Sequence, residues 1–258
     1  MSLRYSLTQP VEKSHLETVY STKNGGVVMA ELYTAVGRFE RKIGEQGYSR
    51  PVVIVDAQEH NVSIPEMVVW TILNWRLLDR SQLNNLFDKN ACQIAELEHI
   101  RCDEQVERML QRGLIACGVG ETDVDALYDL LNSLYVVPII SNPFVKLAAF
   151  FKFIVRDNIS FAKAKEVFRT VPLSTEERRI IALTKQAHLS TAEVIKCVEA
   201  GVYDVSDEEK LMTALYDDDE TTSDNIGSYA EQYDNKRPVL SIISNLYLRR
   251  LILFERIG

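Results

Sequence analysis

Cys92, His99, Cys102 and Cys117 lie in one short stretch of the chain, and all four side chains can bind a metal ion. His99 and Cys102 stand about one helical turn apart, so a helix would place both beside a single ion. The spacing of the four matches no established metal motif, and burial as small apolar side chains explains Cys102 and Cys117 equally well. We therefore expect neither a metal ion nor a cofactor.

Catalytic chemistry has little support in the sequence. The chain has four histidines, and it lacks a nucleophile elbow, a phosphate-binding loop and a dinucleotide-binding fingerprint. Asp56 follows the apolar segment 51–55, which reads as a short strand, and the end of a strand is a common catalytic position. No partner motif surrounds Asp56, so a solvated turn is the better interpretation. We expect no enzyme activity and no catalytic residue.

The composition indicates a folded protein with an uneven charge distribution. The 258 residues are 46% hydrophobic and carry a formal charge of −8, with only 11 glycines and 7 prolines. Residues 204–234 hold eleven acids and one base, so this segment alone carries −10 and the remaining chain is close to neutral. We expect residues 217–234 to form an acidic, solvated and mobile loop. The total charge neither excludes a nucleic-acid partner nor favours one.

Several features indicate a cytoplasmic protein. The N-terminus is not followed by an apolar run, so we expect no signal peptide. The most apolar stretch, residues 136–155, is broken by Pro143 and carries Lys146 and Lys152, which favours buried core over a membrane span. The four cysteines are dispersed and form no Cys-x-x-Cys pair, as expected of reduced thiols.

Hydrophobic periodicity predicts a series of elements in the first half of the chain. A helical stripe covers residues 27–43, and a strand covers 51–55. Ser63 and Glu66 form a capping box for a buried helix that reaches about Leu78, and Asp79 starts a second helix. A third helix is predicted at 98–112, a strand at 114–119, a helix at 124–134 and a strand at 135–140.

Residues 63–119 resemble the winged-helix domain of bacterial transcription regulators. The resemblance rests on a buried first helix, a short second helix, an amphipathic third helix and the run Met109-Leu-Gln-Arg-Gly-Leu-Ile115, which leads into a strand. It covers less than a quarter of the chain and its pattern is loose. It implies a helix-turn-helix protein whose third helix enters the major groove of double-stranded DNA, and residues 118–123 would form the wing.

The outer face of this third helix carries the candidate DNA-binding residues, which are Arg101, Gln105, Arg108 and Arg112. Arginine and glutamine can contact base edges, and arginine can also hold phosphate. The same helix has a net charge of −1, and the expected wing has two acids and no base. This departure leaves an alternative open, a non-catalytic protein-interaction or assembly protein that uses the same fold.

A 16-residue repeat marks the second half. Leu173-Ser-Thr-Glu-Glu177, Leu189-Ser-Thr-Ala-Glu193 and Val205-Ser-Asp-Glu-Glu209 each combine an apolar residue, a serine cap and a glutamate three positions later. They predict three short helices capped by Ser174, Ser190 and Ser206. Residues 173–201 also resemble the paired helices of bacterial regulators, but a small helical bundle or a dimerisation element is favoured. A final helix is expected at 239–254.

Together these patterns predict a mainly α (α+β) fold with three parts. Residues 1–62 form an N-terminal α/β segment, 63–140 a winged-helix-like domain with a small β component, and 141–258 a helical C-terminal domain. The leading hypothesis is a dimeric, cytoplasmic DNA-binding transcription regulator, and the interaction protein is the alternative.

Overall fold

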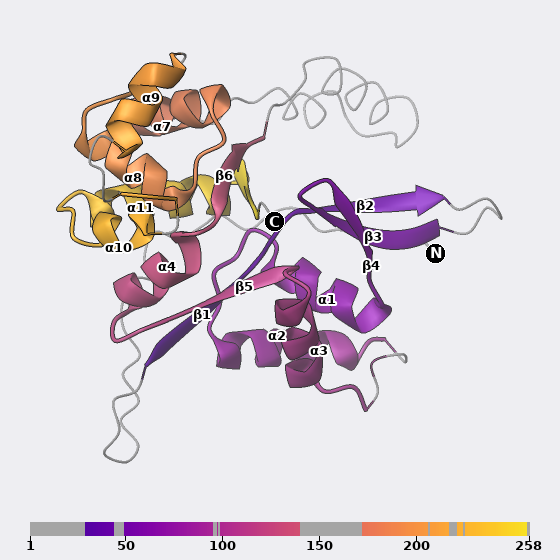
Figure 1. The fold of residues 1–258 in the computed structure, drawn as a ribbon. Helices are drawn as coiled ribbons and strands as arrows, with labels where there is room; N and C mark the ends of the chain where they lie inside the picture. The colour runs from indigo at the N-terminus through magenta and orange to yellow at the C-terminus, as the bar shows by residue number, and fades with distance from the viewer. Residues whose placement is uncertain are drawn as a thin grey trace.

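The computed structural model describes residues 29–43, 49–94, 97, 99–139, 172–205, 207–216, 221–223 and 225–256. Within these residues the protein has nine helices and seven strands, and the strands form three small antiparallel sheets. The fold is therefore α+β, and the prediction of a mainly helical protein is wrong. Figure 1 places helices α1–α3 together at the lower centre and the C-terminal helices at the upper left.

Residues 27–43 were predicted to be helical, and this prediction is wrong for the part that the structure describes. The described part forms strands β1 (Ala30–Ala35) and β2 (Arg38–Ile43), separated by Val36 and Gly37. Gly37 has a φ of 80°, and a side chain there would meet the carbonyl oxygen of Ile54 at 2.2 Å. In β2, Arg38, Glu40 and Lys42 lie on one side and Phe39 and Ile43 on the other, which is the two-residue period of a strand, and Arg41 is the charged exception on the apolar side.

The predicted strand at 51–55 is confirmed, and it belongs to a three-stranded sheet. Strand β3 (Ser49–Val55) pairs with β2 on one side and with β4 (Gln58–Asn61) on the other. Asp56 and Ala57 form the two-residue turn between β3 and β4, and both have positive φ. The backbone N–H of Asp56 donates a hydrogen bond to the Glu255 carboxylate at 3.3 Å, so this turn contacts the C-terminal end of the chain.

Three consecutive helices follow the sheet. The Ser63–Glu66 capping box starts α1 (Ile64–Leu73) as predicted, and Asp79 caps α2 (Arg80–Ala91) in the same way. Helix α1 is shorter than expected because Leu78 pairs with the backbone of Tyr33 in β1. Helix α3 (Cys102–Gln111) begins later than expected, after His99, whose φ of 72° is not helical.

The predicted strand after α3 is present, but the expected wing is not. Strand β5 (Ile115–Gly120) pairs with β1, and Thr122 then caps helix α4 (Asp123–Leu131). Residues 118–123 therefore hold the end of β5 and the start of α4 instead of a β-hairpin. Gly118 and Gly120 let α4 approach the strand, because a side chain at either position would lie within 2.4 Å of α4 backbone atoms.

The C-terminal half is a helical bundle closed by one strand. Its helices are α7 (Thr175–Gln186), α8 (Thr191–Glu199), α9 (Glu208–Tyr216), α10 (Ile226–Ala230) and α11 (Lys236–Leu248). The capping boxes of Ser174 and Ser190 are confirmed, whereas Ser206 lies outside the described residues. The final helix ends at Leu248, and β7 (Ile252–Glu255) pairs with β6 (Tyr135–Pro138).

Two further expectations for this half can be compared with the structure. The expected acidic loop at 217–234 contains α10, whose Ile226 and Ala230 are buried, while residues 217–220 and 224 lie outside the described part. Helix α8 would be the reading helix of a second helix-turn-helix. Most of its side chains are buried, including Lys196, which donates to Thr221 at 3.2 Å. The bundle interpretation is the one that this packing supports.

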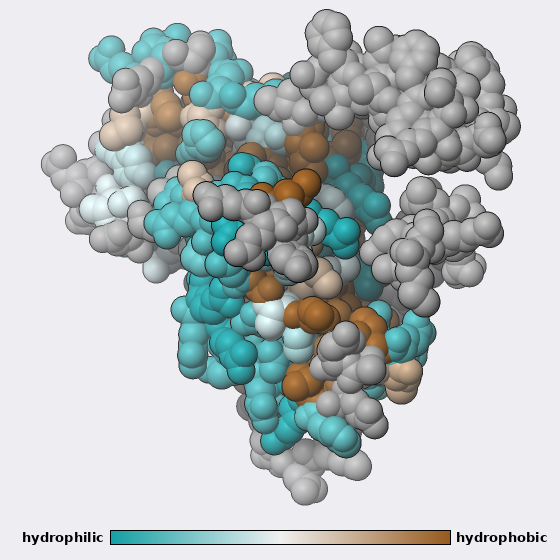
Figure 2. All heavy atoms as spheres, turned by 90° about the vertical axis from the view of Figure 1, so that its right-hand side faces the viewer, coloured by the Kyte–Doolittle hydropathy of each residue, from teal (hydrophilic) through white to brown (hydrophobic). Residues whose placement is uncertain are grey.

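One continuous set of buried apolar residues extends from β1 to β7 and includes residues from all parts of the described chain. The large apolar side chains that remain exposed are dispersed, and Figure 2 shows apolar residues in separate groups on a largely hydrophilic face. Among the described residues, no helix combines the length and the apolar character needed to cross a membrane.

Candidate functional site

The exposed side of α3 carries the residues on which the sequence-based hypothesis depends. It consists of Arg101, Glu104, Glu107, Arg108 and Gln111, and we call this surface the α3 face. The Arg101 side chain is 72% exposed and makes only long ion contacts, to Glu104 at 3.9 Å and to Asp103 at 4.0 Å. Arg108 is exposed and forms no ion pair with any residue that the structure describes. Among the described residues, neither arginine has a short ion pair that would compete with a partner.

Gln105 does not belong to the α3 face. It was predicted to point outward, but it is 4% exposed and lies on the buried stripe of the helix together with Cys102, Val106 and Met109. These four positions follow the helical spacing of an inward face, and the polar residue type concealed this. The side-chain oxygen of Gln105 has no hydrogen-bond partner among the described residues. Gln105 cannot contact a DNA base without unfolding the helix from its neighbours.

Arg112 is also unavailable as a DNA-binding residue. Its guanidinium group donates to the Glu66 carboxylate at 2.8 Å and to the Asn61 carbonyl oxygen at 2.6 Å. The Glu66 side chain is only 4% exposed, and it is the same carboxylate that closes the capping box of α1 with Ser63. Burial raises the pKa of Glu66, but the hydrogen bonds from Ser63 and Arg112 outweigh this effect and lower the pKa below its ordinary value. Arg112 therefore joins the end of α3 to the start of α1.

A shallow recess of about 490 Å³ lies beside the α3 face, between the start of α2 and α3. It is lined by three arginines, three carboxylates and one amide: Arg80, Arg101, Arg108, Asp103, Glu104, Glu107 and Gln111. The formal charges of these residues cancel. The recess thus has no net positive potential that would attract a polyanion.

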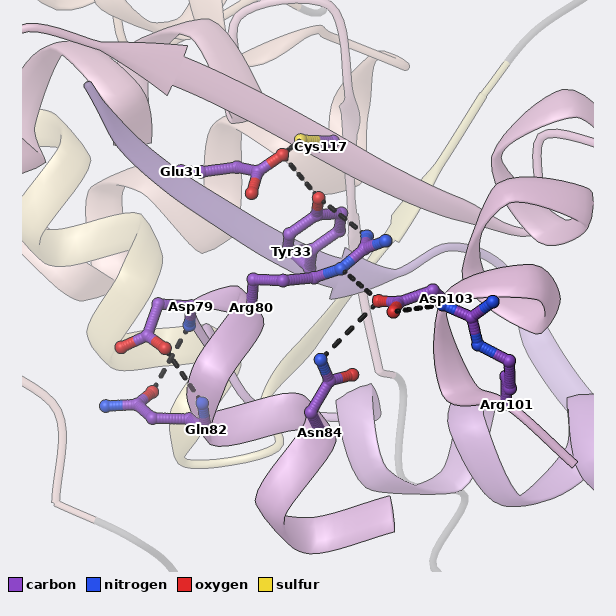
Figure 3. Close-up of polar contacts among 9 residues, drawn as sticks. All are labelled: Glu31, Tyr33, Asp79, Arg80, Gln82, Asn84, Arg101, Asp103 and Cys117. Carbon is purple, nitrogen blue, oxygen red and sulfur yellow. Dashed lines mark hydrogen bonds and ion pairs between the residues drawn. The ribbon is translucent and has the colours of Figure 1, made fainter. Parts of the chain in front are cut away.

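A chain of polar contacts leads from the recess residues Arg80 and Asp103 to Tyr33, Glu31 and Cys117, as Figure 3 shows. Arg80 donates to Asp103 at 2.8 Å and to the hydroxyl oxygen of Tyr33 at 2.9 Å. The Tyr33 hydroxyl in turn donates to Glu31, and the Cys117 sulfur lies 3.7 Å from the same Glu31 oxygen. These contacts connect strands β1 and β5 to helices α2 and α3. They fix the position of Asp103 and hence of one wall of the recess.

The Tyr33 phenol and the Cys117 thiol of this polar chain keep their protons at neutral pH. Burial and the hydrogen bond to Glu31 raise the pKa of Tyr33 far above its ordinary value. Burial also raises the pKa of the Cys117 thiol, to about 11. A thiol and a phenol with such values are poor nucleophiles and poor bases near neutrality. The arrangement supports a structural role for Tyr33 and Cys117.

The sequence-based reasoning missed Glu31, Tyr33 and Arg80. Glu31 and Tyr33 fell inside the segment that was predicted to be helical, where they would not share a face. In a strand they do, because positions two residues apart point to the same side. The pairing of Tyr33 with Cys117 in the β1–β5 ladder could not be inferred, because it joins positions far apart in the chain.

The four residues considered for a metal site do not form one. Cys92 is exposed at the end of α2, Cys102 is buried at the start of α3 and Cys117 lies in β5. All four positions, including His99, belong to the described residues. Among these residues no group of three or more histidine, cysteine, aspartate or glutamate side chains has an arrangement that could hold a metal ion.

A second recess, of about 550 Å³, lies between the end of β5, α4 and α10. It contains four acids: Glu121, Asp125, Asp129 and Glu231. Asp129 accepts the backbone N–H of Val119 at 2.8 Å, and Asp125 accepts the Thr122 hydroxyl at 2.6 Å. Lys236 lies 3.9 Å from Asp125. Two of the acids therefore have local structural partners, and the α3 face remains the stronger candidate.

Comparison with known proteins adds no relative to these observations. No family model matches the chain, and no curated protein and no solved structure matches it either.

Proposed function

We propose that the protein is a non-catalytic interaction or assembly protein that contacts a protein partner through the α3 face. The observation that carries this proposal is the balance of charge in the recess, where three arginines lie among three carboxylates. A surface of this kind pairs with a complementary mixture of charges on another protein, and such pairing provides specificity and orientation.

Two of the four residues expected to bind DNA have other contacts within the fold, which weakens the DNA-binding hypothesis. Gln105 is buried, and Arg112 is bound to Glu66 and Asn61. DNA-binding proteins derive much of their affinity from several arginine and lysine contacts to phosphate. Of the candidate DNA-binding residues, Arg101 and Arg108 are the two that remain exposed. The exposed carboxylates of Glu104 and Glu107 lie between them and would repel phosphate.

DNA binding by a transcription regulator is the second candidate. It is favoured by one specific observation, the exposure of Arg101 and Arg108 on the same side of α3. In this case both side chains would face the major groove, and a dimer would be needed to reach two half-sites. Both candidate functions include a dimeric protein and a cytoplasmic location. The location is supported by the free thiols of the four cysteines.

Site-specific photo-crosslinking in cells tests the proposed function. A photoreactive amino acid at Gln111 reports what touches the α3 face and leaves its charges intact. The same amino acid at Asn245, an exposed amide on α11, is the matched control. We expect protein adducts at position 111 that are absent at position 245. Nucleic-acid adducts would support the second candidate instead, and equal labelling at both positions would refute both.

A further inference from the structure

One row of side chains on the α3 face, which does not include Glu107, has a charge order that is complementary to itself. Arg101, Glu104 and Arg108 follow one another at intervals of three and four residues, so they form one row along the exposed side of the helix. Gln111 continues the row at its C-terminal end. A positive, a negative, a positive and a neutral polar group therefore alternate along about 15 Å of helix.

We propose that the partner of the α3 face is a second copy of this chain, docked antiparallel about a two-fold axis that crosses the exposed row midway between Glu104 and Arg108. In this arrangement Glu104 of each copy lies opposite Arg108 of the other, so the same ion pair forms twice. Arg101 of each copy lies opposite Gln111 of the other, and the guanidinium group can donate to the amide oxygen. A two-fold interface must be self-complementary in this way.

The contacts that these side chains make within one copy leave them able to form ion pairs with a second copy. Arg108 has no ion pair with any described residue, so a new ion pair there replaces none that the structure describes. The contacts of Arg101 with Glu104 and Asp103 are long, at 3.9 and 4.0 Å, so they compete weakly with a new partner. DNA, in contrast, would place phosphate against Glu104. The inference rests on the proposed function and specifies its partner.

The properties of the interface follow from its composition. The row is short, its side chains are exposed and its contacts are mainly ionic, so the dimer is weak and dissociates readily. Salt screens exposed ion pairs, so association weakens as ionic strength rises. These features distinguish the α3 dimer from one that is held together by an apolar patch.

Sedimentation equilibrium on the full chain tests the proposal, at protein concentrations up to a few hundred micromolar. We expect a monomer–dimer equilibrium in about 20 mM salt that weakens at least several-fold in about 500 mM salt. Glu104→Arg and Arg108→Glu should each weaken the dimer about tenfold, because each creates two like-charge contacts. The double variant carrying both changes restores two opposite-charge pairs, so its dimer should return to within about threefold of the wild type.

The matched control reverses another exposed pair, Glu176 and Arg179 on α7, which lie 3.0 Å apart. The variants Glu176→Arg and Arg179→Glu should leave the dimer unchanged. Circular dichroism establishes whether each variant is folded. If a charge-reversal variant does not fold, Glu104→Gln or Arg108→Gln takes its place, and these neutral variants should weaken the dimer less.

Three results would overturn the inference: a monomer under all conditions, a dimer that the single reversals do not weaken, and a double variant that stays as weak as the single ones. The crosslinking experiment separates these failures from failure of the proposed function. Adducts at position 111 with other proteins, and none with a second copy, would leave the proposed function standing and refute only the dimer.

Discussion

Arg112, at the end of α3, and Glu66, in the first turn of α1, form an ion pair with a nitrogen–oxygen distance of 2.8 Å. Glu66 is also the carboxylate that closes the α1 capping box with Ser63. One carboxylate therefore stabilises the start of one helix and the orientation of another. A residue that spacing alone assigned to DNA binding instead holds two helices together.

Removal of Arg112 should therefore destabilise the fold. Arg112→Ala leaves a nearly buried carboxylate without its cation, and we expect a loss of about 2–3 kcal/mol in the free energy of unfolding. Arg108→Ala removes an exposed arginine of the same helix and should change stability by less than about 0.5 kcal/mol. Urea denaturation of both variants measures the difference. Equal stability of the two variants would show that the Glu66 ion pair contributes nothing.

The same pair predicts a pH dependence. Hydrogen bonds from Ser63 and Arg112 lower the pKa of folded Glu66 below 4.5, so the unfolded chain binds a proton more readily than the folded one. The stabilisation is complete above pH 4.5 and disappears as pH falls through the lowered pKa of the folded state. Glu66→Gln should flatten this acid limb of the stability curve. Identical acid limbs in the Glu66→Gln variant and the wild type would contradict the assignment.

Gln105 provides a test of the buried side of α3. Its side-chain oxygen is buried without a partner among the described residues, so Gln105→Leu should keep or raise stability, by up to about 1 kcal/mol. Val106→Asp should unfold the protein, because Val106 is fully buried and the new carboxylate would lack a partner. Thermal melts of both variants are sufficient. A Gln105→Leu variant that loses more than about 1 kcal/mol would indicate that the amide has an essential contact.

The close approach of α4 to β5 depends on glycine. A side chain at Gly118 would lie 2.2 Å from the backbone nitrogen of Leu130, and backbone cannot move aside cheaply. We expect Gly118→Ala to cost about 2–3 kcal/mol in stability. Gly227→Ala is the control, because its nearest neighbour would lie at 3.9 Å. If calorimetry shows equal melting temperatures for the two variants, the packing of α4 on β5 is looser than described.

Local signals in the sequence predicted local structure well. The helix starts at Ser63, Ser174 and Ser190 were identified from a serine cap and a glutamate three positions later, and the start at Asp79 was identified from the aspartate ahead of an apolar stripe. Such a cap depends only on neighbouring residues, so no knowledge of the remaining fold is needed.

Strand pairing depended on distant parts of the chain and was therefore missed. Strand β1 pairs with β5, and β6 pairs with β7 at the far end of the sequence. The stripe in residues 27–43 fits a helix in isolation, and only pairing with distant segments makes it a strand. The same limit applies to α3: its helical character was predicted, but the inward position of Gln105 and the partner of Arg112 depend on α1 and α2.

The most direct test of the central claim is a DNA-binding titration of the full chain at several salt concentrations. If the charge-balanced α3 face binds protein, as we propose, dissociation constants for genomic DNA fragments should be weaker than about 10⁻⁴ M at physiological salt, with no change in the Arg101→Ala and Arg108→Ala variants. Tight binding of a fragment, with a dissociation constant of about 10⁻⁸ M or below, that either variant abolishes would contradict the account and identify α3 as a DNA reader.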